Sequence, residues 1–209
     1  MKKRILLVFM ISMFIMSFFS KAFALNVEEI KALPTLLQMK DLIQDINQMP
    51  TFKYGSINLT SDPSEKSEID WIVLDKNEAT ATLVSKKVLD KSEYSDQNQE
   101  LLMGEIIGKW LKDFKTKAFD VVELKLITDC TLLTKSDIDK YFTQADGNKK
   151  LAVAENARSE GQNLDYWLAN EEKARSGMYF SIYGNYFTGH YGEKFGVRPV
   201  LKINISTNQ

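Results

Sequence analysis

The sequence predicts a single α+β domain preceded by an N-terminal helical segment. Two β-type runs separated by a short polar turn, at residues 69–74 and 79–84, predict a hairpin. Amphipathic helical patterns follow in the middle of the chain, and the last third is rich in β-forming residues. A hairpin, then helices, then terminal strands favour α+β over a doubly wound sheet, in which strands and helices alternate.

The hairpin places Trp71 in its first strand, where we expect the indole to anchor the core. A longer helix is predicted from apolar residues that recur every four positions, a spacing that puts them on one helical face. These residues are Leu102, Ile106, Trp110 and Phe114, with Ile107 and Leu111 beside them.

Three shorter helices are also predicted. Asp120 and Glu123 have the spacing of a capping box, which indicates a helix that begins after Asp120. A second is expected between residues 134 and 142. A third is expected over residues 150–160, with Gly161 as its C-terminal stop.

The last third contains the β-rich runs 166–169, 178–183 and 197–205. Gly184 and Asn185 stand between Tyr183 and Tyr186, so the sequence predicts a hairpin with a two-residue turn that begins with glycine.

The N-terminus has the organisation of a secretory signal peptide. Basic residues 2–4 precede the uncharged apolar run 5–19, and Ala22-Phe23-Ala24 supplies small residues at the positions that signal peptidase requires. We therefore expect cleavage before Leu25, and a mature protein that is periplasmic or secreted. The apolar run is shorter than the roughly 20 residues of a membrane-spanning helix, so no stable span is expected after cleavage.

The mature chain is expected to comprise a helical segment over 25–50 and a domain over 51–209. Asn26 and Glu29 form a capping-box pair at the start of the segment, and its apolar stripe can pack on the domain or on a partner. The expected cleavage removes four of the 27 basic residues and none of the 28 acidic ones, which leaves 23 against 28 and a net charge of −5. This balance disfavours nucleic acids and anionic membranes as partners.

Cys130 is the sole cysteine, so an intramolecular disulfide is impossible. Its apolar neighbours favour a buried strand, in which cysteine acts as a small hydrophobe, over a nucleophilic role. No cofactor and no metal site are predicted.

Several stretches together resemble the bacterial extracytoplasmic family catalogued as domain of unknown function 6273. The family carries Trp-Leu-Arg-Ser after its late tryptophan, whereas this chain has Trp167-Leu168-Ala169-Asn170, so no role of that arginine is carried over. The matching stretches are residues 54–56, 69–74, 83–85, 88–90, 94, 110–111, 114, 119, 132–134, 141–142, 166–168 and 196–201.

The final strands are also similar to the end of C-type-lectin-like domains, including relatives of the formylglycine-generating enzymes. This resemblance implies a fold and not a function. The chain contains neither the acidic and asparagine motifs that hold calcium in sugar-binding lectins nor the paired cysteines of those enzymes.

Candidate site residues are tentative ligand-binding groups in the last third of the chain. His190, the sole histidine, lies in a glycine-flanked turn and is interpreted as an exposed loop residue rather than a catalytic one. The late tyrosines, together with Tyr179 and Phe187, form either a stacking platform or part of the core. The predicted ligand-binding residues are Trp167, Tyr183, Tyr186, His190, Tyr191 and Arg198.

Charged residues allow further alternatives. Arg198 can grip a carboxylate or phosphate, or it can pair with a buried acid that fixes the fold. Asp165, Glu171 and Glu172 can be calcium ligands, although a solvated charge run is favoured.

The favoured functional hypothesis is a non-catalytic binding module for a glycan, a peptide or an envelope component. A hydrolase using carboxylates such as Glu171 or Asp165 is one alternative, and a structural envelope component is another. No catalytic residue is predicted.

Overall fold

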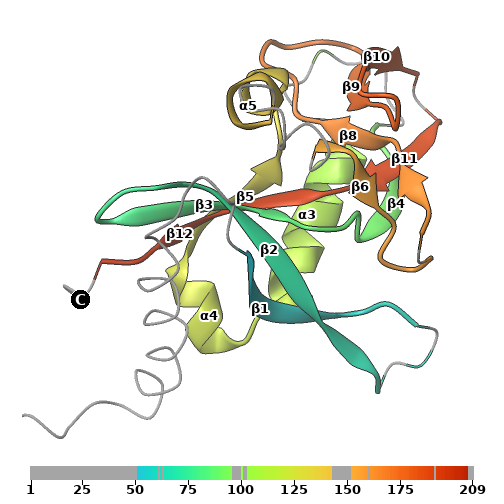
Figure 1. Ribbon diagram of the computed structural model, residues 1–209. Coiled ribbons are helices and arrows are strands. Elements are labelled where there is room, and N and C mark those ends of the chain that lie inside the picture. Colours follow the sequence, from blue (N-terminus) through green and yellow to red (C-terminus); the bar gives the residue numbers. More distant parts are fainter. Residues whose placement is uncertain are drawn as a thin grey trace, which may run out of the picture.

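A computed structural model describes residues 51–60, 62, 64–95, 100, 103–142, 152–159, 161–190 and 192–206. The expected signal peptide, the helical segment over 25–50 and Tyr191 lie outside the described residues. The described chain is built around two five-stranded sheets and a small two-stranded one (Figure 1).

The first sheet is antiparallel throughout and has the order β1-β2-β3-β12-β5. The predicted early hairpin is confirmed as β2 and β3, in which Val73 pairs with Leu83. The strands are β1 (Thr51–Asn58), β2 (Lys66–Lys76), β3 (Thr80–Ser85), β12 (Pro199–Asn204) and β5 (Ile127–Leu132).

The second sheet has the order β10-β9-β8-β11-β4, with β8 and β11 parallel and the other pairs antiparallel. Its strands are β10 (Tyr186–Gly189), β9 (Gly177–Phe180), β8 (Tyr166–Leu168), β11 (Lys194–Val197) and β4 (Asp90–Glu93). The two-stranded sheet pairs β6 (Ala154–Glu155) with β7 (Asn163–Leu164).

A single residue, Arg198, separates β11 from β12, so one stretch of chain runs through the interior of both sheets (Figure 1). The Arg198 side chain is fully buried. Its Nε donates to the carbonyl of Ser85 at 2.9 Å, and one terminal nitrogen donates to the carbonyl of Ala152 at 2.9 Å and to the hydroxyl of Tyr166 at 3.3 Å. Its guanidinium also lies over the rings of Phe142 and Tyr166. One side chain therefore links the two sheets.

Three helices occur within the described ranges: α3 (Glu105–Ala118), α4 (Val121–Leu126) and α5 (Lys135–Tyr141). The predicted capping box of Asp120 and Glu123 is present at the start of α4. A second capping box, formed by Thr134 and Asp137, starts α5. Helix α3 buries the apolar stripe Ile107, Leu111, Phe114 and Ala118.

The predicted α+β class is wrong, because the structure is mostly β, with 46% strand and 20% helix. Part of the difference lies in residues 150–160, whose described portion contains β6 instead of the expected helix. The Val88 N–H donates to Glu155 O at 2.9 Å and the Ala157 N–H to Val88 O at 2.8 Å. In a helix, the backbone groups of Glu155 and Ala157 would bond to residues nearby in the chain, but here they bond to Val88. Gly161, with φ of 74°, then turns the chain towards β7.

The predicted two-residue turn in the late hairpin is also wrong. Strand β9 ends at Phe180 and β10 begins at Tyr186, so five residues connect them. Within this connection, the Ser181 N–H donates to Asn185 O and the Gly184 N–H to Ser181 O. Ile182 and Tyr183, which the sequence placed in or beside a strand, therefore lie in an exposed loop.

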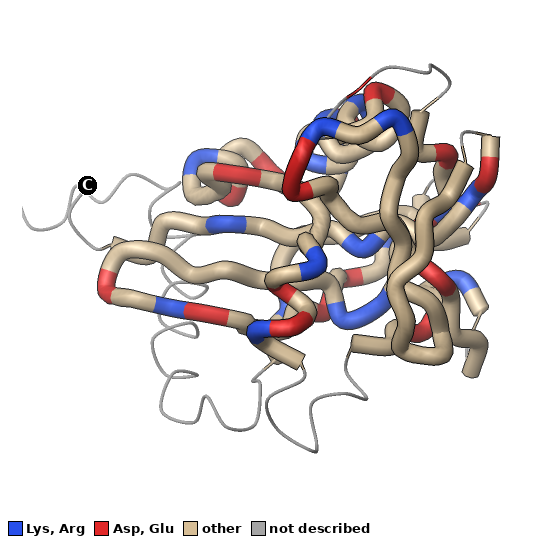
Figure 2. The backbone as a smooth tube through the Cα atoms, turned by 90° about the horizontal axis from the view of Figure 1, so that it is seen from above, with Lys and Arg blue, Asp and Glu red and all other residues tan. Residues whose placement is uncertain are grey.

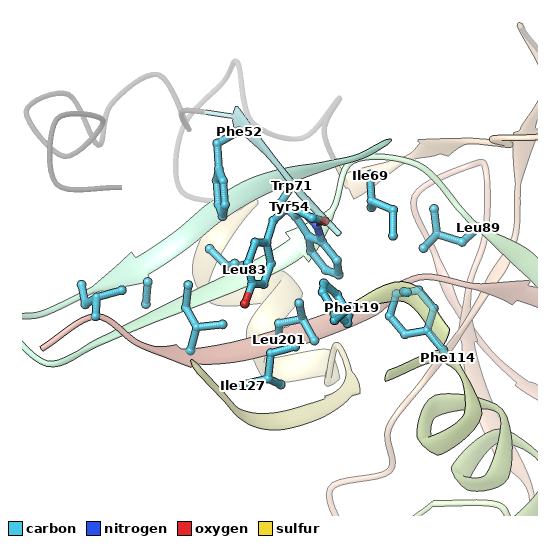
Figure 3. Close-up of a cluster of buried hydrophobic side chains, with 14 residues drawn as sticks. Phe52, Tyr54, Ile69, Trp71, Leu83, Leu89, Phe114, Phe119, Ile127 and Leu201 are labelled. Carbon is cyan, nitrogen blue, oxygen red and sulfur yellow. Dashed lines mark hydrogen bonds between the residues drawn. The ribbon is translucent and has the colours of Figure 1, made fainter. Parts of the chain in front are cut away.

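Aromatic rings from distant segments form the core beneath the first sheet (Figure 3). Phe119 contacts Tyr54, Trp71 and Phe114, with ring centroids 5.1, 6.3 and 5.7 Å apart. The Trp71 indole N–H donates to Tyr54 O at 2.7 Å, which satisfies its buried polar atom. Trp71 is fully buried, as expected.

Basic and acidic positions are interspersed along the chain (Figure 2).

Of the helices described, none has the length and apolar character needed to cross a membrane.

We predict that Arg198→Met lowers the free energy of unfolding by about 3 kcal/mol, because it leaves buried carbonyl oxygens without donors. Arg198→Lys should recover little, since an ammonium group cannot reproduce the planar fork of donors. Urea unfolding of both variants measures the effect. Lys202→Met in β12 is the control, because this side chain is exposed. Equal stability of the Arg198 and Lys202 variants would contradict a central role for Arg198.

Candidate functional site

A cavity of about 670 Å³ lies between α3 and the β1–β2 hairpin. The two elements are neighbours, and the far end of the hairpin extends away from the rest of the domain (Figure 1). We call this cavity the α3 groove. One helical face lines it, at spacings of i, i+3, i+4, i+7 and i+8. These helical residues are Trp110, Asp113, Phe114, Lys117 and Ala118.

The other side of the α3 groove comes from parts of the chain that are distant in sequence. Ile57 and Asn58 belong to β1, and Lys66 is the first residue of β2. Asp90, at the start of β4, and Arg158, after β6, complete the lining. The site thus exists only when both sheets and α3 are assembled.

Trp110 supplies the main aromatic surface of the groove. Its ring stacks on Phe114, one helical turn further on, with centroids 5.1 Å apart and planes at 9°. The indole Nε1 donates to Oδ2 of Asp90 at 2.9 Å, which fixes the ring's orientation. Trp110 is half-buried, whereas Trp71 and Trp167 are fully buried. Trp110 is therefore the one tryptophan of this chain that a bound ligand can cover.

Arg158 connects the two sides of the groove. Its Nε lies 3.8 Å from Oδ1 of Asp90, and its terminal nitrogens donate to the carbonyls of Leu59 at 2.9 Å and Asn58 at 3.4 Å. The guanidinium therefore ties the end of β1 to β4. This contact therefore joins two parts of the groove's lining.

The loop beyond Asn58 is held by hydrogen bonds of its own. The Asn58 side chain donates to Asp62 O at 2.6 Å and accepts from the Thr60 N–H at 3.1 Å. Oδ1 of Asp62 accepts from the Ser64 N–H at 2.8 Å. These local bonds connect the described residues that flank the groove.

Trp167 and Arg198 were predicted to bind ligand, but both are fully buried and serve the core. The Trp167 Nε1 donates to Ser92 O at 2.7 Å, and Gly189 lies against the ring so closely that an added Cβ would come within 2.5 Å of it. The partners of Arg198 include the carbonyl and hydroxyl oxygens given above. Neither side chain offers surface to a ligand in this structure.

The remaining predicted residues that the structure describes, Tyr183, Tyr186 and His190, lie in different surroundings. Tyr186 faces α5, where its hydroxyl donates to Asp139 and Lys135 lies over its ring. Burial raises the pKa of Tyr186 far above its ordinary value, and the hydrogen bond to Asp139 raises it further. Tyr183 is 82% exposed and His190 is exposed in a turn before β11, as interpreted from the sequence.

The other face of the late strands carries a row of stacked rings. Tyr179 lies 5.6 Å from Phe187 and 4.0 Å from Phe195, with interplanar angles of 26° and 25°. Phe187, Tyr183 and Ile182 are three of the four large apolar side chains that the described residues expose. The β9–β10 hairpin is therefore a second surface that can contact a partner.

The carboxylates considered for catalysis or calcium have structural partners. Oε1 of Glu171 accepts from the Ser136 N–H at 2.9 Å, and hydrogen bonding to Ser136 lowers the pKa of Glu171, opposite to what a general acid requires. Oδ1 of Asp165 accepts from the Ile182 N–H at 2.8 Å. The described residues hold no group of three potential metal ligands.

Comparison with known proteins gave no relatives. No model of a protein family, no curated protein and no solved structure matches the chain. The resemblances noted above therefore stay predictions.

Cys130 lies in β5 and is half-buried, with Sγ 3.9 Å from the Leu111 carbonyl. Burial raises the pKa of its thiol from 9.0 to about 12. At a pH below both values, the thiolate population is about a thousandfold smaller than for a free thiol, so alkylation of the native protein should be slower by a similar factor.

Iodoacetamide labelling at pH 8, with and without urea, measures this difference. The native rate should rise about tenfold per pH unit until the protein unfolds, because the thiolate population does. Equal rates for the native and the unfolded chain would contradict a buried, protonated thiol.

Proposed function

We propose that this chain is an extracytoplasmic, non-catalytic binding module whose ligand, a glycan, a peptide or another envelope component, lies in the α3 groove. The observation that carries the proposal is the preformed groove, which combines a stacked indole with charged groups on its rim. The predicted signal peptide supports the extracytoplasmic location.

The groove's chemistry suits recognition. A half-buried aromatic ring contributes apolar contact area, and polar groups around it fix a ligand's orientation. Arg158 and the hydrogen bonds of Asn58 connect residues on the two sides of the groove, so little conformational entropy is lost when a ligand enters. Glu171 and Asp165 are the carboxylates that the hydrolase hypothesis would use as acid and base. Both accept hydrogen bonds from backbone N–H groups, so they do not support that hypothesis.

Trp110 allows a direct test. We expect a ligand in the groove to shield Trp110 from acrylamide quenching and to raise the melting temperature, because it binds only the native state. A panel of glycans, peptides and cell-wall fragments is titrated against the protein from residue 25 onwards.

Trp110→Phe keeps a ring against Phe114 but removes the indole, so the shielding signal should disappear in this variant. Tyr183→Ala, on the β9–β10 hairpin, is the matched control and should bind normally. Loss of binding in Tyr183→Ala, with no protection of Trp110, would move the site to the hairpin. The absence of any ligand-dependent shielding would contradict the groove as a binding site.

A further inference from the structure

Resting on the proposed function, we infer that the groove's ligand carries a carboxylate, which Lys66 and Lys117 bind, attached to an apolar or ring-containing body that lies on Trp110. Asp113, between these points on α3, then accepts a hydrogen bond from the ligand. The proposal follows from which charged groups of the groove are already engaged and which are available.

Lys66 and Lys117 converge from different elements. The Lys66 Nζ donates to the backbone carbonyl of Lys117 at 3.3 Å, which brings the start of β2 to the last turn of α3. Both side chains are exposed and both line the groove. The Lys117 ammonium has no ion pair within the described part of the chain, and the Lys66 ammonium retains donors beyond its one bond. Together they form a cationic end of the groove.

The other charged pair of the groove, Asp90 and Arg158, is already neutralised. Asp90 accepts from the Trp110 indole and from the Lys91 N–H at 2.9 Å, and it lies beside Arg158. The Arg158 guanidinium in turn donates to two backbone carbonyls. Since these groups satisfy one another, they shape the groove more than they attract an ion. The available charge comes from the two lysines and Asp113, a net charge of +1 that one carboxylate balances.

Asp113 places an acidic side chain on α3 between Trp110 and Lys117. In the described ranges its carboxylate has neither a hydrogen bond nor an ion pair, and it lies one turn before Lys117, about 6 Å along the helix axis. It can therefore accept from an amide or hydroxyl group of a ligand whose carboxylate reaches the lysines. Trp110 precedes Lys117 by about 10 Å along the same axis. That distance matches about three residues of an extended peptide.

A carboxylate of this kind occurs at a peptide C-terminus and on an acidic sugar, and matched probes distinguish the two sources. One pair is an N-acetylated tripeptide of alanine, leucine and phenylalanine as the free acid and as the C-terminal amide. The other pair is a glucuronic-acid disaccharide and its methyl ester. Binding is followed by shielding of Trp110 and by calorimetry.

We expect the acid of at least one pair to bind about fivefold more tightly than its neutral partner, which is the upper range for an exposed ion pair. Lys117→Ala and Lys66→Ala should each reduce the preference for the acid, and the double variant should abolish it. The preference should weaken between about 0.05 and 0.5 M NaCl, because salt screens exposed charges. Lys112→Ala is the matched control, since this lysine is exposed on α3 outside the groove.

Equal affinity for acid and neutral probes would overturn the inference, and so would a preference that survives in the double variant. Failure of all four probes to shield Trp110 would overturn it as well. If neutral ligands nevertheless shield Trp110, the proposed binding function is supported and only the inferred preference for a carboxylate is rejected. If no ligand of any kind shields Trp110, both proposals fail.

Discussion

The two sheets depend on the buried guanidinium of Arg198. An arginine can be fully buried when its donors are satisfied, and its partners here belong to β3, to β8 and to the chain just before β6. Because carbonyl oxygens accept most of these bonds, the interaction fixes backbone positions rather than two mobile side chains. This contact, together with the continuous β11–β12 stretch, joins the two sheets.

The α3 groove is lined by residues of both sheets. Phe114 packs in the core of the first sheet, whereas Ile107 and Leu111 pack against Trp167 and Tyr94 under the second. Helix α3 is therefore held by both sheets, and its remaining face borders the space beside the β1–β2 hairpin. Gly55, with φ of 66°, allows β1 to pass directly over Phe119, where a Cβ would meet the ring at 2.4 Å. The hairpin's course is thus set by close packing at its base.

The elements that the sequence predicted correctly are set by residues close together in the chain. The helix α3, the capping box of Asp120 and Glu123 and the β2–β3 hairpin are encoded by residues a few positions apart. The strand β6, the fold class and the groove were not predictable in this way, because they depend on pairing between residues such as Val88 and Glu155. The spacing of Trp110, Asp113 and Lys117 was a usable signal for the groove. It went unnoticed because Trp110 was assigned to the apolar stripe.

The shared stretch β11–β12 determines when the protein can fold during synthesis. Residues 194–204 leave the ribosome after every other described strand, yet they occupy interior positions in both sheets. Until then β3 and β5 have no strand between them, and neither have β8 and β4. Before this stretch is made, a nascent chain therefore lacks an interior strand of each sheet, so stable folding is expected only late in synthesis. The residues that join the two sheets are thus also the last of the described strands to be made.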